Sequence, residues 1–398
     1  MKVVLIDPSG FTPPYDHCLA NALAQQGCQV ALVTSHIPLG LWAQNAIYER
    51  WEHFYRLTNL LNKTKIRTYL KGCEHPFNMA RLLQRLRCWK PDVMHFQWVP
   101  FPLVDRFFLR RLRKVAPLVL TVHDTEPFHG AASSRLQYVG FISALKEFDH
   151  YIVHTQYSKE ALVRGFGLSE EHISVIPHGV FAYYRELISD TEKTWQHLQY
   201  EGKKKVLFLG VLKPYKGVDI LLRAFARLPE EVAKDAILQI VGYPKMPADP
   251  LKALARELGV EGRVFWDLRF VDEAEVAAYF AQSDVVVLPY RRIDQSGVLM
   301  IALAFGKPIV ASRVGGFAET IQDGVHGFLV EPGNVESLAQ ALTRLLVDNK
   351  LRAQMGKAVQ ELASGKFSWD SIAKKTTSVY ETLGRCYGRE VRSGKGFS

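Results

Sequence analysis

Cysteine is scarce in this sequence, and long apolar runs are missing. The 398 residues include five cysteines and no C-x-x-C pair, which argues against a disulfide framework and against a zinc site. No segment reaches the roughly 18 apolar residues that a membrane-spanning helix needs. The apolar run at residues 3–6 ends at Asp7 and is typical of a strand, not of a secretory signal. We therefore expect a cytoplasmic protein in a reducing compartment.

Several ligand-binding motifs are absent as well. There is no D-x-D motif of the kind that holds a metal ion, so we expect no metal and no other cofactor. The first strand–helix turn lacks G-x-G-x-x-G, and no acidic residue ends the second strand at residues 29–34. A dinucleotide site is therefore not expected there. The composition, 48% hydrophobic and 23% charged, is that of a globular protein with large cores.

The positive charge is concentrated in one part of the chain. The formal net charge is +10, and residues 50–114 hold 15 lysines and arginines against four acidic residues. Such a segment attracts an anionic partner: lipid headgroups, a phosphorylated acceptor or nucleic acid. Aromatic residues lie among the bases, a combination typical of a membrane interface: Trp42, Tyr48, Trp51, Phe54, Tyr55 and Tyr69. We expect residues 36–114 to contact an anionic membrane surface, or else to form a helix with a solvated basic face.

Apolar runs alternate with helical patterns along the chain, which predicts parallel sheets covered by helices. Strands at 2–7 and 29–34 enclose a helix that follows Pro13 and Pro14. In the second half, a strand at 285–288, a helix at 297–305 and a strand at 309–311 repeat the pattern. The polar segment at 182–205 predicts a linker between two Rossmann-like domains.

Two polar loops in the second half suit a phosphate. The loop at 289–296 leads from the carboxyl end of a strand to a helix N-terminus, where backbone N–H groups and the helix dipole attract anions. A second loop, 210–217, places Lys213 and Lys216 between a strand and a helix. Both loops are expected to bind the same anionic ligand.

These segments resemble the retaining glycosyltransferases of the GT-B fold, in particular family four. The closest agreement is the run of Gly306, Pro308, Ile309, Val310, Ala311, Ser312, Gly315, Gly316 and Glu319. The phrase T-V-H-D at 121–124, the sequence P-H-G-V at 177–180 and Lys216-Gly217 also match. The family's paired glutamates do not, because Asp294 stands in the first position and Ala302 in the second. Val211 likewise replaces an arginine.

The resemblance implies an α/β fold of GT-B type, with two Rossmann-like doubly wound domains that face each other across a cleft. Residues 1–185 would bind the acceptor, residues 203–366 the nucleotide sugar, and a helix at 367–385 would cross back to the first domain. The implied reaction is metal-independent transfer of a hexose, with retention, from a UDP- or GDP-linked sugar. The acceptor would be a saccharide or a lipid-linked saccharide, reached by an enzyme peripheral on the inner face of the membrane.

The same resemblance assigns roles to individual residues. Those expected to be catalytic are His123, Asp294 and Lys216. The expected donor-binding residues are Gly210, Lys213, Lys216, Asp294, Gln295, Ser296, Gly297, Val298 and Glu319. Residues expected to line the acceptor cleft are Gly10, Asp124 and His178, with His129 a weaker candidate. Several of these site residues have structural alternatives: Gly10 as a tight turn that needs glycine, Glu319 as the cap of its own helix, His123 as a structural histidine, and Lys213 and Lys216 as solvated loop lysines.

Other functions stay open at this point. A different GT-B enzyme, such as a sugar-nucleotide epimerase or a transferase with a soluble acceptor, would carry the same donor motifs. The basic segment would also suit a nucleic-acid-binding protein. That alternative lacks a helix-turn-helix, zinc or aromatic β-sheet signature and leaves the donor motifs unexplained, so no nucleic-acid partner is expected.

Overall fold

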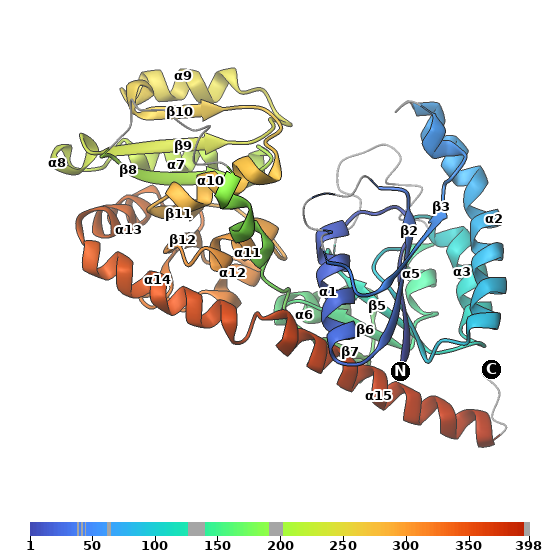
Figure 1. Ribbon diagram of the computed structural model, residues 1–398. Coiled ribbons are helices and arrows are strands. Elements are labelled where there is room, and N and C mark those ends of the chain that lie inside the picture. Colours follow the sequence, from blue (N-terminus) through green and yellow to red (C-terminus); the bar gives the residue numbers. More distant parts are fainter. Residues whose placement is uncertain are drawn as a thin grey trace. The chain divides into compact units, whose positions relative to one another are not determined.

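The computed structural model of the chain describes residues 1–37, 40, 43, 45–61, 65–125, 140–190 and 202–393. Trp42 and His129, named above, lie outside these ranges. The chain divides into two compact units (Figure 1). Unit 1 comprises Met1–Gly179 and Trp369–Ser398, and unit 2 comprises Val180–Ser368. Each unit is built on one parallel sheet and is described by itself.

Unit 1 contains a seven-stranded parallel sheet with the order β3-β2-β1-β4-β5-β6-β7. Its strands are β1 (Lys2–Asp7), β2 (Gln29–Ser35), β3 (Glu49–Phe54), β4 (Val93–Phe96), β5 (Leu118–Val122), β6 (His150–Val153) and β7 (Ile173–Val175). Its α-helices are α1 (Pro13–Gln25), α2 (Lys65–Trp89), α3 (Pro102–Leu112), α5 (Phe141–Leu145), α6 (Gln156–Phe166) and α15 (Trp369–Ser393), and its 3-10 turns are η2 (Thr58–Leu60) and η3 (Glu170–His172).

The two faces of this sheet differ in chemistry because successive strand residues point to opposite sides. Val4 and Ile6 of β1 belong to an apolar core shared with α2 and α3. His95 of β4 faces the other way, where its Nδ1 lies 2.5 Å from the hydroxyl oxygen of Tyr380 on α15. Its Nε2 lies 2.7 Å from Thr121 Oγ1. A buried polar contact therefore fixes α15 against this face, beside α1.

Three elements of unit 1 differ from the expectation. β3 was not predicted at all, although it pairs in parallel with β2 at the edge of the sheet. The amphipathic pattern at 77–89 predicts a helix, but α2 begins already at Lys65 and continues through Pro76. The crossing helix was expected to end at residue 385, whereas α15 extends to Ser393. In each case the polar composition of the segment hid the regular structure.

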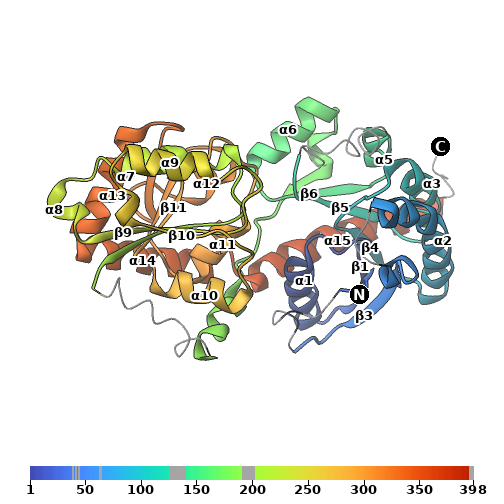
Figure 2. The ribbon, with the colours of Figure 1, turned by 90° about the horizontal axis from the view of Figure 1, so that it is seen from above.

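Unit 2 contains a six-stranded parallel sheet with the order β10-β9-β8-β11-β12-β13. Helices α7, α8, α9 and α13 pack together on one face, and α10, α11 and α14 lie on the other (Figure 2). The strands are β8 (Lys204–Leu209), β9 (Ala236–Val241), β10 (Val264–Asp267), β11 (Val285–Leu288), β12 (Ile309–Ser312) and β13 (Gly327–Val330). The α-helices are α7 (Val218–Phe225), α8 (Glu230–Ala233), α9 (Asp249–Glu257), α10 (Glu273–Gln282), α11 (Gly297–Ala304), α12 (Gly315–Thr320), α13 (Val335–Val347) and α14 (Asn349–Ser364), with 3-10 segments η4 (Ala182–Asp190), η6 (Pro214–Lys216) and η7 (Glu261–Arg263).

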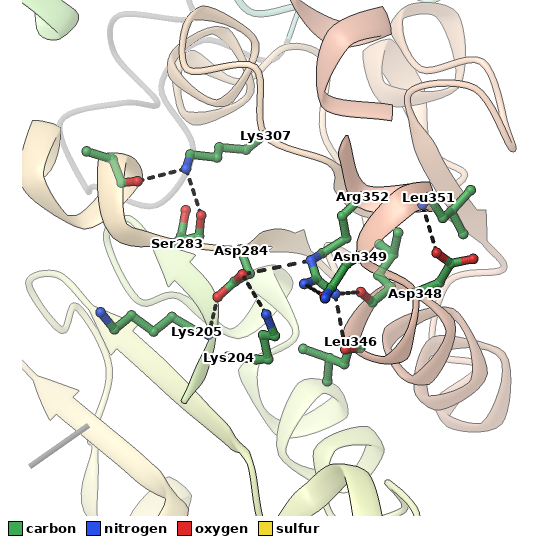
Figure 3. A network of polar contacts seen from close by, with 12 residues as sticks. Lys204, Lys205, Ser283, Asp284, Lys307, Leu346, Asp348, Asn349, Leu351 and Arg352 are labelled. Carbon is green, nitrogen blue, oxygen red and sulfur yellow. Dashed lines mark hydrogen bonds and ion pairs between the residues drawn. The ribbon is translucent and has the colours of Figure 1, made fainter. Parts of the chain in front are cut away.

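A polar network ties α14 to the amino ends of β8 and β11 (Figure 3). Asp284, which precedes β11, accepts a hydrogen bond of 2.8 Å from the backbone N–H of Lys205 and lies 3.8 Å from the Arg352 guanidinium. The Lys307 ammonium donates to the carbonyl oxygens of Ala281 and Ser283, at 2.8 and 2.7 Å. The loops described next follow the opposite, carboxyl ends of the strands.

Candidate functional site

Lys216 of unit 2 is a buried cation with a neutral partner. The residue is 9% exposed. Its Nζ donates a 3.0 Å hydrogen bond to the hydroxyl oxygen of Tyr290 and lies 4.6 Å from the centre of that ring. Desolvation lowers the pKa of Lys216. Within the described residues no carboxylate forms an ion pair with this ammonium, so its charge is compensated by a hydroxyl and a ring alone.

Gly210 brings the end of β8 against the same ammonium. A Cβ at this position would lie 3.0 Å from Lys216 Nζ and 3.5 Å from a methyl group of Val298. Its φ of +137° is also one that residues with side chains rarely adopt. Gly210 and Lys216 of one predicted motif and Val298 of another are thus neighbours. Lys213 has its ammonium 5.8 Å from the Tyr215 ring centre, and Val211 is 37% exposed.

The loop after β11 packs against the loop at 210–217, which carries Lys213 and Lys216. A Cβ at Gly217 would lie 2.0 Å from the carbonyl oxygen of Pro289, so only glycine permits this approach. The Arg291 guanidinium donates to the Pro214 carbonyl at 2.6 Å and to Asp219 at 2.7 Å. Its backbone N–H donates to the Tyr215 carbonyl at 2.7 Å. The contacts of Pro289 and Arg291 therefore hold the loop at 210–217 in place.

The N-terminus of α11 lies at the end of the same loop. Ser296 is the N-cap residue, but its side chain forms no capping hydrogen bond. Its backbone N–H instead donates to Gln295 Oε1 at 2.9 Å. The backbone N–H of Gly316 donates to the Asp294 carbonyl at 3.0 Å, and a Cβ at Gly315 would lie 1.7 Å from the carbonyl oxygen of Ile293. Gly315 is thus required for this loop to pack against its neighbour.

Two positions of the family's motif, Ala302 and Glu319, differ in how deeply they are buried. Ala302, in the position of the family's second glutamate, is fully buried in the apolar core of unit 2. Glu319 is exposed and lies in the last turn of α12, whose N-cap is Val314 without a side-chain hydrogen bond. Both roles expected for Glu319, the contact with a ribose and the cap of its own helix, stay predictions.

In unit 1, the loop after β1 folds around the Asp7 carboxylate. This carboxylate accepts hydrogen bonds from four backbone N–H groups: Ser9 at 3.2 Å, Gly10 at 2.9 Å, Phe11 at 2.6 Å and Thr12 at 3.2 Å. Gly10 has a φ of +61°, as the tight turn requires. The N–H groups that a phosphate would use are thus occupied by the protein's own carboxylate.

Asp16 of α1 is the neighbour of Asp7 and is 1% exposed. Its Oδ1 accepts a 3.3 Å hydrogen bond from Thr12 Oγ1. Burial and the charge of Asp7 raise the pKa of Asp16. The hydrogen-bonding groups of both side chains have partners when Asp7 is ionised and accepts from its four N–H donors while Asp16 carries the proton.

His123 lies at the carboxyl end of β5 in an aromatic surrounding. The Trp98 ring stacks on it at 5.3 Å and 15°, and the Tyr15 ring meets it edge-on at 4.7 Å. His178 also contacts Tyr15, at 4.9 Å between ring centres, and its Nδ1 donates to the Gly179 carbonyl at 2.7 Å. Asp124 is exposed. Burial lowers the pKa of His123 well below its usual range and that of His178 to about 3, so both are neutral at pH 7.

Sequence reasoning missed Gln97, His154 and Tyr290. Gln97 follows β4 directly and His154 follows β6 directly, as His123 follows β5. Neighbouring parallel strands end at one edge of a sheet, so polar residues in the first position after each strand meet there. That pattern was a usable signal for Gln97 and His154. No motif marks Tyr290, whose role depends on a contact with a distant lysine. Within the described ranges, no three His, Cys, Asp or Glu side chains lie where they could share a metal ion.

Comparison with known proteins agrees with this geometry. Residues 189–362 match the family described as "Glycosyl transferases group 1" and residues 17–181 match "Glycosyltransferase Family 4". An uncharacterised glycosyltransferase of Methanocaldococcus jannaschii is 30% identical over 323 residues, which span 78% of this chain and 80% of that protein. The D-inositol 3-phosphate glycosyltransferase of Corynebacterium glutamicum is 32% identical over 242 residues, 58% of this chain and 57% of that protein.

Solved structures show the same fold at lower identity. Anabaena HepE in complex with UDP-glucose has a TM-score of 0.70 at 23% identity, over 96% of this chain and 100% of that one. The sucrose-phosphate synthase of Thermosynechococcus elongatus has a TM-score of 0.69 at 20% identity, over 97% and 100%. The chain therefore belongs to the group 1 glycosyltransferases, and its two parallel sheets are those of the GT-B fold.

Proposed function

We propose that this glycosyltransferase moves a hexose, with retention of configuration, from a nucleotide diphosphate sugar to a saccharide or lipid-linked saccharide. The observation that carries the proposal is the buried ammonium of Lys216, which donates to Tyr290 and forms no ion pair with a carboxylate among the described residues. A desolvated cation without a counter-ion favours an anionic ligand strongly. The complexes of HepE with UDP and UDP-glucose support a nucleotide as that ligand.

In this proposal the donor diphosphate binds between Lys216 and the first N–H groups of α11, with Lys213 nearby. The bond from the anomeric carbon to the diphosphate breaks, and the acceptor oxygen bonds to that carbon on the same face. The acceptor's proton passes to the leaving phosphate oxygen. The ammonium and the N–H groups stabilise the departing charge without a metal, and Asp294 holds hydroxyls of the donor sugar.

A thermal-shift titration tests the donor site. We expect either the uridine or the guanosine series of nucleoside diphosphates and sugar nucleotides to raise Tm, with and without magnesium. A ligand at 100 times its Kd stabilises the native state by about 2.7 kcal/mol. An unchanged Tm with every nucleotide would refute a nucleotide donor, and a shift that requires magnesium would refute metal independence. Adenosine diphosphate serves as the control for unspecific phosphate binding.

We further propose that the enzyme contacts an anionic membrane through η2 and the first half of α2. No helix among the described residues has the length and apolarity of a membrane span, so contact would be peripheral. Glu74 on α2 accepts hydrogen bonds from the N–H groups of Leu57 and Thr58, which places η2 beside α2. The solvent-exposed apolar side chains here, with their exposed fractions, are Leu57 (72%), Leu60 (83%), Leu61 (46%), Tyr69 (79%), Leu70 (39%) and Phe77 (72%).

Exposed bases accompany this apolar patch, including Arg56 and Arg81. We expect the protein to float with vesicles of phosphatidylcholine and phosphatidylglycerol but not with phosphatidylcholine alone, and high salt should release it. The double variant Leu60→Ser/Phe77→Ser should weaken vesicle binding more than tenfold, because each side chain contributes about 1.5–3 kcal/mol when buried. Phe270→Ser is the matched control, since Phe270 is 81% exposed on unit 2. Equal flotation of the double variant and the control would contradict the assignment.

A further inference from the structure

The side chains of Gln97, His123 and His154 form a hydrogen-bonded row at the carboxyl edge of the unit 1 sheet. His123 Nε2 lies 3.0 Å from the side-chain oxygen of Gln97. His123 Nδ1 lies 3.3 Å from His154 Nε2, and His154 Nδ1 lies 3.0 Å from the carbonyl oxygen of Ile176. The row thus ends on an atom whose role is fixed, since a carbonyl oxygen only accepts.

The carbonyl determines where each proton lies. His154 Nδ1 must carry a hydrogen in order to donate to Ile176. Burial lowers the pKa of His154 to about 4, so at pH 7 the ring has one N–H and its Nε2 is an acceptor. The facing Nδ1 of His123 must therefore carry the hydrogen of the contact between the two rings. His123 is neutral as well, which leaves its Nε2 with a lone pair.

Gln97 provides an independent check on this arrangement. An unprotonated His123 Nε2 cannot share a hydrogen bond with the amide oxygen that faces it. The amide nitrogen of Gln97 is buried and has no partner among the described residues. Rotating the amide by half a turn exchanges its oxygen and nitrogen, which leaves the shape unchanged. The nitrogen then donates to His123 Nε2, which gives the nitrogen a partner and removes the mismatch at Nε2, while the amide oxygen takes the position that the nitrogen held.

We propose that Gln97 and His154 are positioning residues that hold His123 as the Nδ1–H tautomer and present its Nε2 as a hydrogen-bond acceptor. A ligand that takes the place of the Gln97 amide must then supply a donor, which for this family means a sugar hydroxyl. A hollow of about 20 Å³ lined by Gln97, Trp98 and His123 has room for one such group. This role in binding rests on the proposed function, whereas the tautomer itself does not.

The tautomer is measured by ¹⁵N NMR of the ligand-free full chain with labelled histidine, because a protonated and a bare ring nitrogen resonate far apart. The His123 signals are assigned by their loss in His123→Gln. We expect a protonated Nδ1 and a bare Nε2 in the wild type. His154→Gln, whose amide can both donate to Ile176 and accept from His123, should keep this pattern. His154→Leu should lose it, and Gln97→Glu should place a proton on Nε2, because a carboxylate only accepts.

A protonated Nε2 in the wild-type protein would overturn the proposal directly. In transfer assays, we expect His154→Leu and Gln97→Glu to lower kcat/KM about tenfold, the effect of one lost hydrogen bond, and His154→Gln to restore most of it. If the tautomers change among the variants as expected but kcat/KM is the same in all three variants as in the wild type, the role in substrate binding would be overturned. If the wild type transfers no sugar at all, the proposed function fails while the NMR result still decides the tautomer.

Discussion

Lys216→Met is expected to reduce sugar transfer by about two to three orders of magnitude, the usual effect of removing one preorganised donor to a developing charge. Lys216 is buried and touches Tyr290, so methionine of similar length fills the same space. The loss should appear in kcat and in the response of Tm to nucleotide. Lys357→Met on α14, where the lysine side chain is 80% exposed, is the matched control and should retain full activity.

The same substitution should leave the protein as stable as before or more stable. Burial lowers the pKa of Lys216 from 10.5, so its charge is less favourable in the folded state than in the unfolded chain. That cost is fully present below the folded pKa and disappears as pH rises toward 10.5. Methionine has no such cost, and Tm of Lys216→Met should equal or exceed that of the wild type at pH 7. An inactive variant with a much lower Tm would indicate misfolding instead, and full activity would remove Lys216 from the site.

Asp7→Asn and Asp16→Asn are expected to differ sharply although both replace a buried carboxyl group by an amide. At position 7 the amide presents an N–H group toward backbone N–H groups that now bond to a carboxylate. Unsatisfied buried donors make this cost roughly 3 kcal/mol or more. At position 16 the amide N–H replaces the carboxyl O–H that faces Asp7, and we expect a change within about 1 kcal/mol. Tm and hydrogen exchange of the Gly10 and Phe11 amides measure the difference.

The pH dependence separates this explanation from simple loss of packing. A folded pKa of Asp16 raised above 3.8 means that the native protein holds a proton that the unfolded chain releases. The contribution of Asp16 to the stability of the wild type is therefore present below pH 3.8 and declines as pH rises through the folded pKa. Asp16→Asn should lack this part of the decline. If both variants lose equal stability, or if Asp16→Asn shows the same decline as the wild type, the shared proton is refuted.

The fold could be predicted from the sequence where strands are apolar. β1, β8 and β11 are buried on both faces and read as short apolar runs. β3 has the sequence ERWEHF and, among the described strands, pairs with β2 alone, so its polar residues carry no strand signal although Trp51 and Phe54 are buried. An edge strand with solvated side chains cannot be recognised by apolar content.

The site was predictable to the extent that it lies within local motifs. Gly210, Lys216 and Val298 come from two motifs, and the close approach at Gly210 brings them together. The contact of Lys216 with Tyr290 joins residues 74 positions apart, and no pattern of spacing reveals it. The row of Gln97, His123 and His154 likewise follows from strand order rather than from sequence order. Sequence reasoning therefore misses above all the residues that contact a motif only in the folded structure.

Because of the carboxylate at the end of β1, the first turns of the two similar sheets differ in their capacity to bind an anionic ligand. In unit 1 the first turn is saturated by Asp7 and is complete without any small molecule. In unit 2 the corresponding turn, at the end of β8, ends in the Lys216 ammonium, which forms no ion pair within the part of the chain that the structure describes. Isothermal titration with a nucleotide should consequently give a stoichiometry of one per chain despite the duplicated architecture, and an inhibitor that mimics a diphosphate has only one of the two turns to fill.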